Sequence, residues 1–478
     1  MEFTVLGHGA LFVEHEASST SILVDPWLGG SCYWRSWWHY PPSEASEAHL
    51  RPTYVYLTHH HFDHFHYPSM RRLDKGARVL VPRFGVDVMP GEVRSLGFAS
   101  VTELPHGEVT PLAPGLRVAS YQYGFDDSAF VIASDDGTVL ADLNDCKMRG
   151  ASLQQVLDDF GPPTFLFKSH SWAQAYPVHY TADDPKDLAV LSRDSYAADF
   201  LAIVREMRPR YAVPFASMTC FLHPETADVN DHIVTPVEVR DAFEAAGGVA
   251  GVELKVLVPG DSWSAARGFD VAEHDWYSRR GEHLAVLTDK ARPVVDAALA
   301  DEASVTVPWP AFAAHMQRFV DALPPGAGRV LLKRPVVFEV PSDAVMPWWV
   351  VDGRAGRVYR SASLPGGHAS IVRVPEAVLA DAVEKDLVNL IHISMRMRVE
   401  LRPGGVDTDL AFWALMAVHE LGYLPLRRVL TPRMAGVAWR RRRELLGMVT
   451  GRLFGKGTLA ERMTGGLGAV ASGDTAPS

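Results

Sequence analysis

Cysteine is scarce in this sequence, and its scarcity excludes a disulfide-stabilised fold. The 478 residues include three cysteines: Cys32, Cys146 and Cys220. Three cysteines cannot form the paired framework of a small secreted protein, so the sequence predicts a reducing, cytoplasmic environment. Positive charge is also in deficit, with 46 Lys and Arg against 57 Asp and Glu and a formal net charge of −11. An acidic chain of this kind does not favour binding to nucleic acid.

Long hydrophobic runs are missing as well. No apolar stretch approaches the roughly 20 residues of a membrane-spanning helix. The opening residues, MEFTVLGHGALFVEH, lack the basic segment and apolar core of a secretory signal. We therefore expect no integral membrane association. A hydrophobic content of 47% and a charged content of 22% are typical of a globular enzyme, and the length allows two or three domains.

The pattern that is present is an alternation of short β-type runs with helical segments over residues 1–265, which is typical of an α/β domain. Residues 269–443 predict a second, smaller α+β domain. Within it, residues 391–401 alternate strictly between apolar and polar side chains and predict a single half-buried strand. Residues 444–478 predict a basic and apolar helix followed by a disordered tail. The basic run at 440–443 is either an interfacial helix or, as we favour, a solvated helix face.

A cluster of metal-ligand side chains carries the most information about chemistry. It follows a predicted strand at 53–58 and comprises His59, His60, His61, Asp63 and His64. Imidazoles two positions apart in an extended chain point to the same side, so His59 and His61 can share one ion. Asp63 and His64 fall on the turn that follows and can serve a second ion. A solvated polar loop is the alternative, which we disfavour because histidines this dense repel one another when charged.

Imidazole and carboxylate ligands suit zinc, iron or manganese. Two such ions can activate water or bind dioxygen. The sequence therefore predicts a site for two divalent metals, with Asp63 and His64 among its catalytic residues.

The motif His-x-His-x-Asp-His after a strand resembles the signature of the metallo-β-lactamase superfamily. Its flanks are similar to the CMP-N-acetylneuraminate hydroxylase branch of that superfamily, at residues 24–28, 37–38, 144–146 and 214–216. The resemblance covers roughly residues 1–260. It implies an N-terminal αββα sandwich that carries the metal site.

The resemblance also implies further ligands. Asp145, rather than Asp142, corresponds to the carboxylate that bridges the two metals and belongs with the catalytic residues. His170 follows a predicted strand, at a position that is acidic in the sialic-acid enzymes. His223 corresponds to the last histidine of the superfamily. Asp25 is either structural or a carboxylate that orients a ligand histidine.

The sequence departs from the superfamily in two ways. The middle histidine is missing, and Tyr123, Asp126 and His106 are candidates to replace it; an oxygen ligand there would fit iron better than zinc. The sialic-acid hydroxylases also carry a Rieske iron–sulfur domain, which needs two cysteines and two histidines in paired motifs. The three cysteines of this sequence cannot supply it.

Several other side chains have open roles. We expect His8 and His39 to support the site or pack in the core rather than bind metal. An aromatic group either lines a substrate pocket or forms a packed lid: Trp27, Tyr33, Trp34, Trp37 and Trp38. The second domain has a role in substrate binding as one hypothesis and weakly resembles sterol-carrier-like folds. Its Trp348 and Trp349 either line a cavity or, as we favour, pack in a core.

Two functions follow from these observations. The first is a non-haem iron oxygenase that hydroxylates a small or nucleotide-linked substrate, with electrons from an external reductase or ferredoxin. The second is a hydrolase of an ester, phosphodiester, amide or lactone, in which the metals activate water. The missing middle histidine favours the oxygenase and iron, with zinc or manganese as alternatives. A non-catalytic binding module is the least favoured interpretation.

Overall fold

The computed structural model describes residues 1–446 except 87 and 172–173, so the expected tail beyond 446 lies outside the described residues. Eight strands form the first sheet, in the order β19-β18-β1-β2-β3-β6-β7-β8. From β3 to β8 neighbouring strands are parallel, so their carboxyl ends meet at one edge. The strands are β1 Glu2–Val5, β2 Leu11–His15, β3 Thr20–Val24, β6 Tyr54–Tyr56, β7 Arg78–Pro82, β8 Val101–Leu104, β18 Ser262–Ser264 and β19 Gly268–Asp270.

Seven strands form the second sheet, in the order β17-β15-β13-β12-β11-β10-β9. Strands β9 to β12 are antiparallel, whereas β12, β13, β15 and β17 run parallel. The strands are β9 Thr110–Ala113, β10 Leu116–Tyr123, β11 Asp127–Ser134, β12 Val139–Asn144, β13 Phe165–Lys168, β15 Tyr211–Pro214 and β17 Glu253–Leu254.

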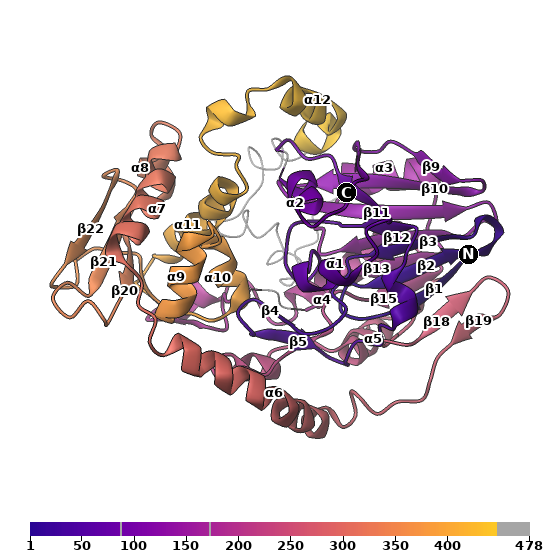
Figure 1. Ribbon diagram of the computed structural model, residues 1–478, viewed down its shortest axis with the longest axis horizontal. Helices are drawn as coiled ribbons and strands as arrows, with labels where there is room; N and C mark the ends of the chain where they lie inside the picture. Colours follow the sequence, from indigo (N-terminus) through magenta and orange to yellow (C-terminus); the bar gives the residue numbers. More distant parts are fainter. Residues whose placement is uncertain (87, 172–173, 447–478) are drawn as a thin grey trace.

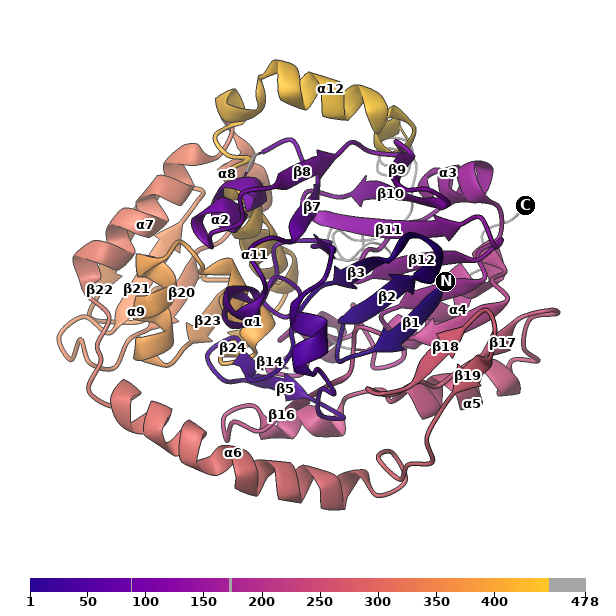
Figure 2. The same cartoon turned by 45° about the vertical axis from the view of Figure 1, so that its right-hand side comes forward.

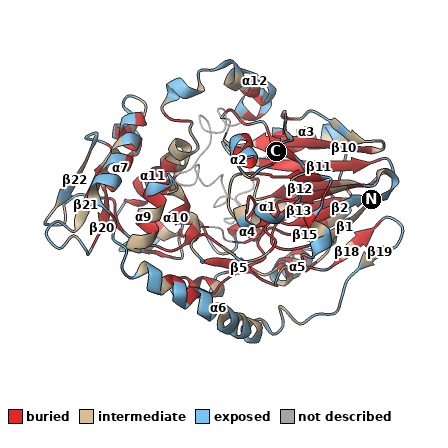
Figure 3. Cartoon of the chain, viewed as in Figure 1, coloured by how far each residue is buried: buried red, intermediate tan, exposed pale blue. Residues whose placement is uncertain are grey.

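The two sheets pack face to face and carry helices on their outer faces (Figures 1 and 2). Alternate side chains of a strand point to opposite faces. Phe3 of β1 and Phe130 of β11 therefore meet in the core between the sheets, while Ala129 and Val131 face the helices. Figure 3 shows the buried residues concentrated in these layers. Helices α1 Tyr67–Arg72 and α2 Met89–Ser95 cover the first sheet, and α3 Ala151–Phe160, α4 Ser195–Met207 and α5 Pro236–Ala245 cover the second. The predicted αββα sandwich is confirmed.

A third sheet of six strands lies beside the sandwich, in the order β14-β24-β23-β20-β21-β22. Its strand β14 comes from within the first 265 residues and pairs parallel with β24. The long helix α6 runs along the outside and connects the sandwich to this region (Figure 1). The elements are β14 Tyr180–Ala182, β20 Val336–Glu339, β21 Trp348–Asp352, β22 Arg357–Ser361, β23 Ser370–Arg373, β24 Arg398–Leu401, α6 Arg280–Glu302, α7 Trp309–Ala322, α8 Ala327–Leu331, α9 Glu376–Glu384, α10 Asn389–Ser394, α11 Val406–Glu420 and α12 Pro432–Arg440.

The single strand predicted at 391–401 is wrong. The chain there ends helix α10 at Ser394 and begins strand β24 only at Arg398. The first three polar residues of the alternation are buried rather than solvated: His392 contacts Tyr180, Ser394 is buried, and Arg396 is fully buried with Glu225 and Glu302. Alternation indicates a strand only when one of its two faces is solvated.

Trp349 packs in the core of the second region, in ring contact with Trp309 and Phe312, as the core interpretation predicted. A sterol-carrier-like role for this region stays a prediction. Among the residues that the structure describes, no helix combines the length and apolar character needed to cross a bilayer.

Candidate metal centre

Five of the seven predicted ligands gather at one edge of the sandwich, beyond the ends of strands from both sheets: His59, His61, Asp63, His64 and Asp145. The motif follows β6, whose parallel neighbour β3 ends just before Asp25. His8 follows β1, and Asp145 follows β12. Strand ends from both sheets thus bring together side chains that are distant in sequence, as is usual for sites in α/β folds.

His64 lies at the centre of this group. Its Nδ1 atom is 2.7 Å from Oδ2 of Asp25. Its Nε2 atom is 3.4 Å from Oδ2 of Asp63 and 3.3 Å from Oδ2 of Asp145. That Nε2 atom is buried and has no hydrogen-bond partner among the described residues. A buried, unpartnered imidazole nitrogen that faces two carboxylates fits a metal ion.

Asp25 orients the ring of His64 in addition to accepting hydrogen bonds that stabilise the local backbone. Its Oδ1 accepts a hydrogen bond from the backbone N–H of Thr58 at 2.8 Å. Its Oδ2 accepts from Oγ1 of Thr58 at 2.6 Å and from Nδ2 of Asn144 at 2.7 Å. These donors fix the carboxylate, and the carboxylate fixes the ring of His64, which is the arrangement that supports ligand histidines in metal sites.

The charged side chains around His64 also favour the binding of a cation. Burial alone would lower the pKa of His64, but Asp63 and Asp25 raise it well above the ordinary value. Burial would raise the pKa of Asp63, yet His64 and His8 hold it well below the usual range. Three carboxylates therefore surround one buried ring and favour positive charge there, which a divalent metal supplies.

The first pair of motif histidines forms a second, adjacent group. Nε2 of His59 lies 2.9 Å from Nδ1 of His61. Burial lowers the pKa of His59 well below its ordinary value, and the neighbouring rings of His64 and His61 lower it further. His59 is thus a neutral imidazole, the form that binds metal.

Of the three candidates for the missing middle histidine, Asp126 forms an ion-pair contact with this pair. Its Oδ2 is 3.9 Å from Nε2 of His61. His106 turns away, with Nε2 at 3.2 Å from Oε1 of Gln155 on α3. Among the described residues, Tyr123 forms no hydrogen bond with His59 or His61.

His8 is a candidate ligand that sequence reasoning placed in a supporting role. Its Nε2 lies 3.0 Å from Oδ2 of Asp63, and one ligand atom each of His8, Asp63 and His64 lie within 4.8 Å of one another. The signal was the pair of glycines that flank His8. A Cβ at Gly9 would lie 3.0 Å from the ring of His64, so the chain can pass this close only without a side chain.

His60 points away from the centre, as the alternation of the extended segment predicts. Its Nε2 lies 2.5 Å from Oε2 of Glu92 on α2. Asp142 also stays apart: its Oδ1 accepts from the backbone N–H of Asn144 at 3.1 Å, and burial raises its pKa well above the ordinary value. The contact of Asp145 with His64 supports Asp145 as the bridging carboxylate.

The structure does not bring His170 and His223 into either group. His170 is buried with both ring nitrogens unpartnered among the described residues, and burial lowers its pKa to about 3. Its backbone N–H donates to Oγ of Ser217 at 3.1 Å. His223 has Nδ1 at 4.0 Å from Oε2 of Glu225, beside the second region. Ligand roles for these two histidines stay predictions.

The aromatic segment is packed over the site and reaches the second region. The hydroxyl of Tyr33 donates to Oδ1 of Asp63 at 2.5 Å. Trp34 donates from Nε1 to Oδ2 of Asp381 at 2.9 Å, and Trp37 donates to the carbonyl of Ile393 at 3.0 Å. Residues 33–35 have φ values of 51°, 53° and 62°. Three successive left-handed residues without glycine are strained, and such strain concentrates at functional sites.

Two facing sheets, outer helices and a His-x-His-x-Asp-His turn at one edge are now established together. This chain has the metallo-β-lactamase fold. The resemblance stated from the motif is confirmed for the fold. No family model matches the chain.

Comparisons with known proteins cover the same part of the chain. A Mycobacterium tuberculosis protein named "Putative Rieske 2Fe-2S iron-sulfur protein" is 27% identical over 290 residues, 55% of this chain and 53% of that protein. The cytidine monophosphate-N-acetylneuraminic acid hydroxylase of Danio rerio is 23% identical over 238 residues, 46% of this chain and 39% of the hydroxylase. The chain thus spans about half or less of the length of these relatives.

One solved structure with similar architecture is an isothiocyanate hydrolase from Delia radicum gut bacteria. It is 16% identical, with a TM-score of 0.40 over 55% of this chain and 98% of the hydrolase.

Proposed function

We propose that this protein is a dinuclear metal enzyme of the metallo-β-lactamase fold. The observation that carries the proposal is the buried, unpartnered Nε2 of His64 facing Asp63 and Asp145. Asp63, His64 and His8 would hold one ion. His59, His61 and Asp126 would hold the other, and Asp145 would lie between them.

The ions, when bound, supply the activation of water or dioxygen. The residues of this chain position their ligands. Asp25 holds the ring of His64, while the hydroxyl of Tyr33 holds Oδ1 of Asp63 and leaves Oδ2 facing His8 and His64. Because these contacts are buried, the carboxylate of Asp63 keeps one orientation and is shielded from bulk water.

The oxidative function is the one we favour. A carboxylate at the position of the middle histidine, Asp126, makes the ligand set richer in oxygen and suits iron better than zinc. The partial sequence similarity to a hydroxylase also supports an oxidative function. We propose a non-haem di-iron oxygenase that hydroxylates a small or nucleotide-linked substrate.

Electrons would come from an external reductase or ferredoxin. Cys32, Cys146 and Cys220 are buried and free, and burial raises the pKa of each thiol. They cannot provide an iron–sulfur cluster within this chain. Free thiols also fit the cytoplasmic location that we propose.

We further propose that residues 1–265 carry the metal centre and that residues 269–443 shape access to it. The contacts of Trp34 with Asp381 and of Trp37 with Ile393 support this division, because both tryptophans flank the segment that covers Asp63.

Oxygen dependence tests the proposed function. Protein loaded with iron should consume oxygen in the presence of a chemical reductant and a panel of nucleotide-linked and small hydroxy-acid substrates. The Asp63→Ala protein should not, while His60→Ala should behave as the wild type. Turnover of ester or phosphodiester substrates by the zinc-loaded protein under strict anaerobiosis, without reductant, would replace the oxygenase with a hydrolase.

A further inference from the structure

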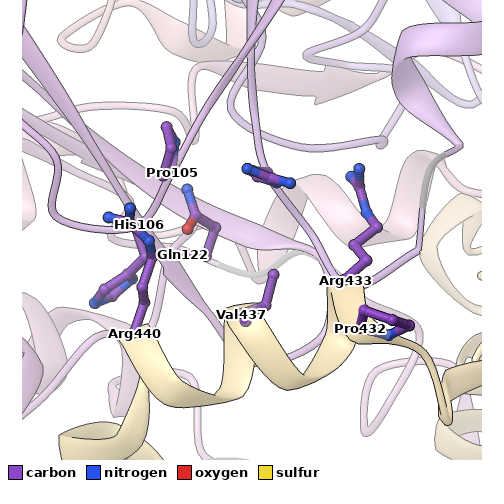
Figure 4. A pocket seen from close by; sticks show the side chains of 9 residues that line it. Pro105, His106, Gln122, Pro432, Arg433, Val437 and Arg440 are labelled. Atoms are coloured by element: carbon purple, nitrogen blue, oxygen red, sulfur yellow. The ribbon is translucent and has the colours of Figure 1, made fainter.

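A small cavity lies between helix α12 and the sandwich. None of its lining residues is a proposed metal ligand. Its volume is about 90 Å³, well below the roughly 300–1,000 Å³ of sites for drug-sized ligands. A cavity of this size suits a single small polar group. In Figure 4, Arg433 and Arg440 rise from α12 on either side of Val437, and His106 and Gln122 lie across the cavity from the helix.

Two buried acceptor atoms lie in the wall opposite α12. Oε1 of Gln122 has no partner among the described residues, while its Nε2 donates to the carbonyl of Leu104 and to Oγ of Ser120. These two bonds fix which end of the amide faces the cavity. Gln122 is fully buried, so its orphaned oxygen calls for a donor.

His106 presents the second acceptor. Its Nε2 lies 3.2 Å from Oε1 of Gln155. We assign Nε2 as the donor to that oxygen, which leaves Nδ1 as an acceptor without a described partner. Burial lowers the pKa of His106 to about 4, which keeps the ring neutral near neutral pH.

Arginine guanidinium groups supply the donors on the other side. Arg433 is tied to Glu103 and to the carbonyl of Phe84. Arg440 is joined to Glu108 at 3.0 Å. Arg83 is exposed and forms no ion pair with any described residue. Three guanidinium groups against two carboxylates leave an excess of positive charge at the cavity, in a chain whose net charge is −11.

We propose that this cavity binds a protonated phosphate group. The arginines would donate to its anionic oxygens, as planar guanidinium groups do to phosphates. The P–O–H group would donate its one proton to Gln122 Oε1 or to His106 Nδ1, which an anion without a proton cannot do. The site therefore selects phosphate over sulfate.

The phosphate group has two sources with the same chemistry. It belongs either to a small soluble phosphate or to the monoester headgroup of an anionic lipid such as phosphatidic acid. The surroundings of the cavity are compatible with a lipid surface, because Trp439 is 70% exposed and Leu430 is 82% exposed beside it in sequence. The experiment distinguishes the two sources.

Binding is measured at pH 6, where about half of a phosphate monoester carries a proton. One arm titrates inorganic phosphate, and then sulfate, into the full chain by calorimetry. The second arm measures co-sedimentation with phosphatidylcholine vesicles with and without phosphatidic acid. The variants are Arg83→Ala, the matched surface control Arg94→Ala on α2, and Asp63→Ala, which removes phosphate binding by the metal centre.

We expect phosphate or phosphatidic acid to bind at least tenfold more tightly than sulfate or plain phosphatidylcholine. Arg83→Ala should weaken this binding at least fivefold, while Arg94→Ala and Asp63→Ala should leave it unchanged. Binding in the first arm identifies a soluble phosphate, and binding only in the second arm identifies a lipid. Equal affinity for sulfate, loss of binding in Asp63→Ala, no effect of Arg83→Ala, or no binding in either arm would overturn the proposal.

Discussion

The Nδ1 atom of His64 lies 2.7 Å from Oδ2 of Asp25, and this contact leaves Nε2 as the ring nitrogen that faces the proposed metal ligands. The pair spans 39 positions of the chain and joins the end of β3 to the turn after β6. Asp25 thereby sets which ring nitrogen of His64 carries the proton and how the ring is oriented, although the two residues are far apart in the sequence.

Replacement of Asp25 by asparagine should weaken metal binding about 10- to 100-fold, the range seen when a group that supports a ligand histidine is lost. The substitution keeps the size of the side chain and removes its charge. Asp142→Asn is the matched control, because Asp142 is equally buried and accepts its hydrogen bond from the backbone of Asn144 rather than from His64. Metal affinity is measured by competition with a chelator. Equal losses in both variants would show that the effect is general destabilisation.

The two neighbouring histidines of the motif should behave oppositely. His61→Ala should lose metal, because His61 lies with His59 and Asp126. His60→Ala should retain metal and lose about 1 kcal/mol of stability or less, since its contact with Glu92 is partly exposed. Elemental analysis and thermal denaturation give the two readouts. Comparable metal loss in His60→Ala would contradict the assigned sidedness.

Asp126 should determine both the number and the kind of metal. Asp126→Ala should reduce the bound metal from two ions per chain to about one, because the second ion would lose one of its carboxylates and keep only His59, His61 and the shared Asp145. Asp126→His should retain two ions and shift the preference from iron towards zinc. Asp135→Ala, an exposed acidic residue at the far end of β11, is the control. Two tightly bound ions in Asp126→Ala would remove Asp126 from the ligand set.

Arg396 should contribute strongly to the stability of the interface between the sandwich and the second region. It is fully buried and contacts Glu225 at 2.8 Å, Glu302 at 2.7 Å and the carbonyl of Trp34 at 3.1 Å. Arg396→Ala leaves two carboxylates without their partner and should cost about 3–5 kcal/mol. Arg318→Ala, which breaks an exposed pair with Asp386, should cost under about 1 kcal/mol. Urea denaturation measures the free energy of unfolding of both variants. Similar losses of stability would mean that Arg396 does not stabilise this interface more than an exposed arginine does.

The parts of the fold that were predictable carry local signals. The sandwich follows from strand-length apolar runs, and the positions of His59 and His60 follow from the alternation of an extended chain. The glycines beside His8 indicate a close approach of the chain, but they do not name its partner, because the contact with Asp63 joins two positions 55 residues apart. The failure at residues 391–401 has the same origin: Arg396 is buried by Glu225 and Glu302, which lie 171 and 94 positions away. A pattern of polar side chains predicts which residues face solvent. A polar side chain can instead be buried when residues distant in the sequence supply its hydrogen-bond or ion-pair partners.

The contact of Tyr33 with Asp63 was also beyond sequence reasoning. The aromatic segment was recognised in the sequence. Whether it lines a pocket or forms a packed lid depends on which residues lie against it, and the sequence does not show these contacts. The structure shows a packed segment whose left-handed turn depends on contacts with Asp381 and Arg396.

Anomalous diffraction from crystals of the protein purified without added metal tests the central claim most directly. Data collected at the iron and zinc absorption edges locate each ion and identify its element. The account predicts two peaks per chain, one within bonding distance of Asp63 and His64 and the other beside His59 and His61, with Asp145 between them and iron as the element. Well-ordered side chains at these positions with no anomalous peak, or with a single peak bound elsewhere, would contradict it.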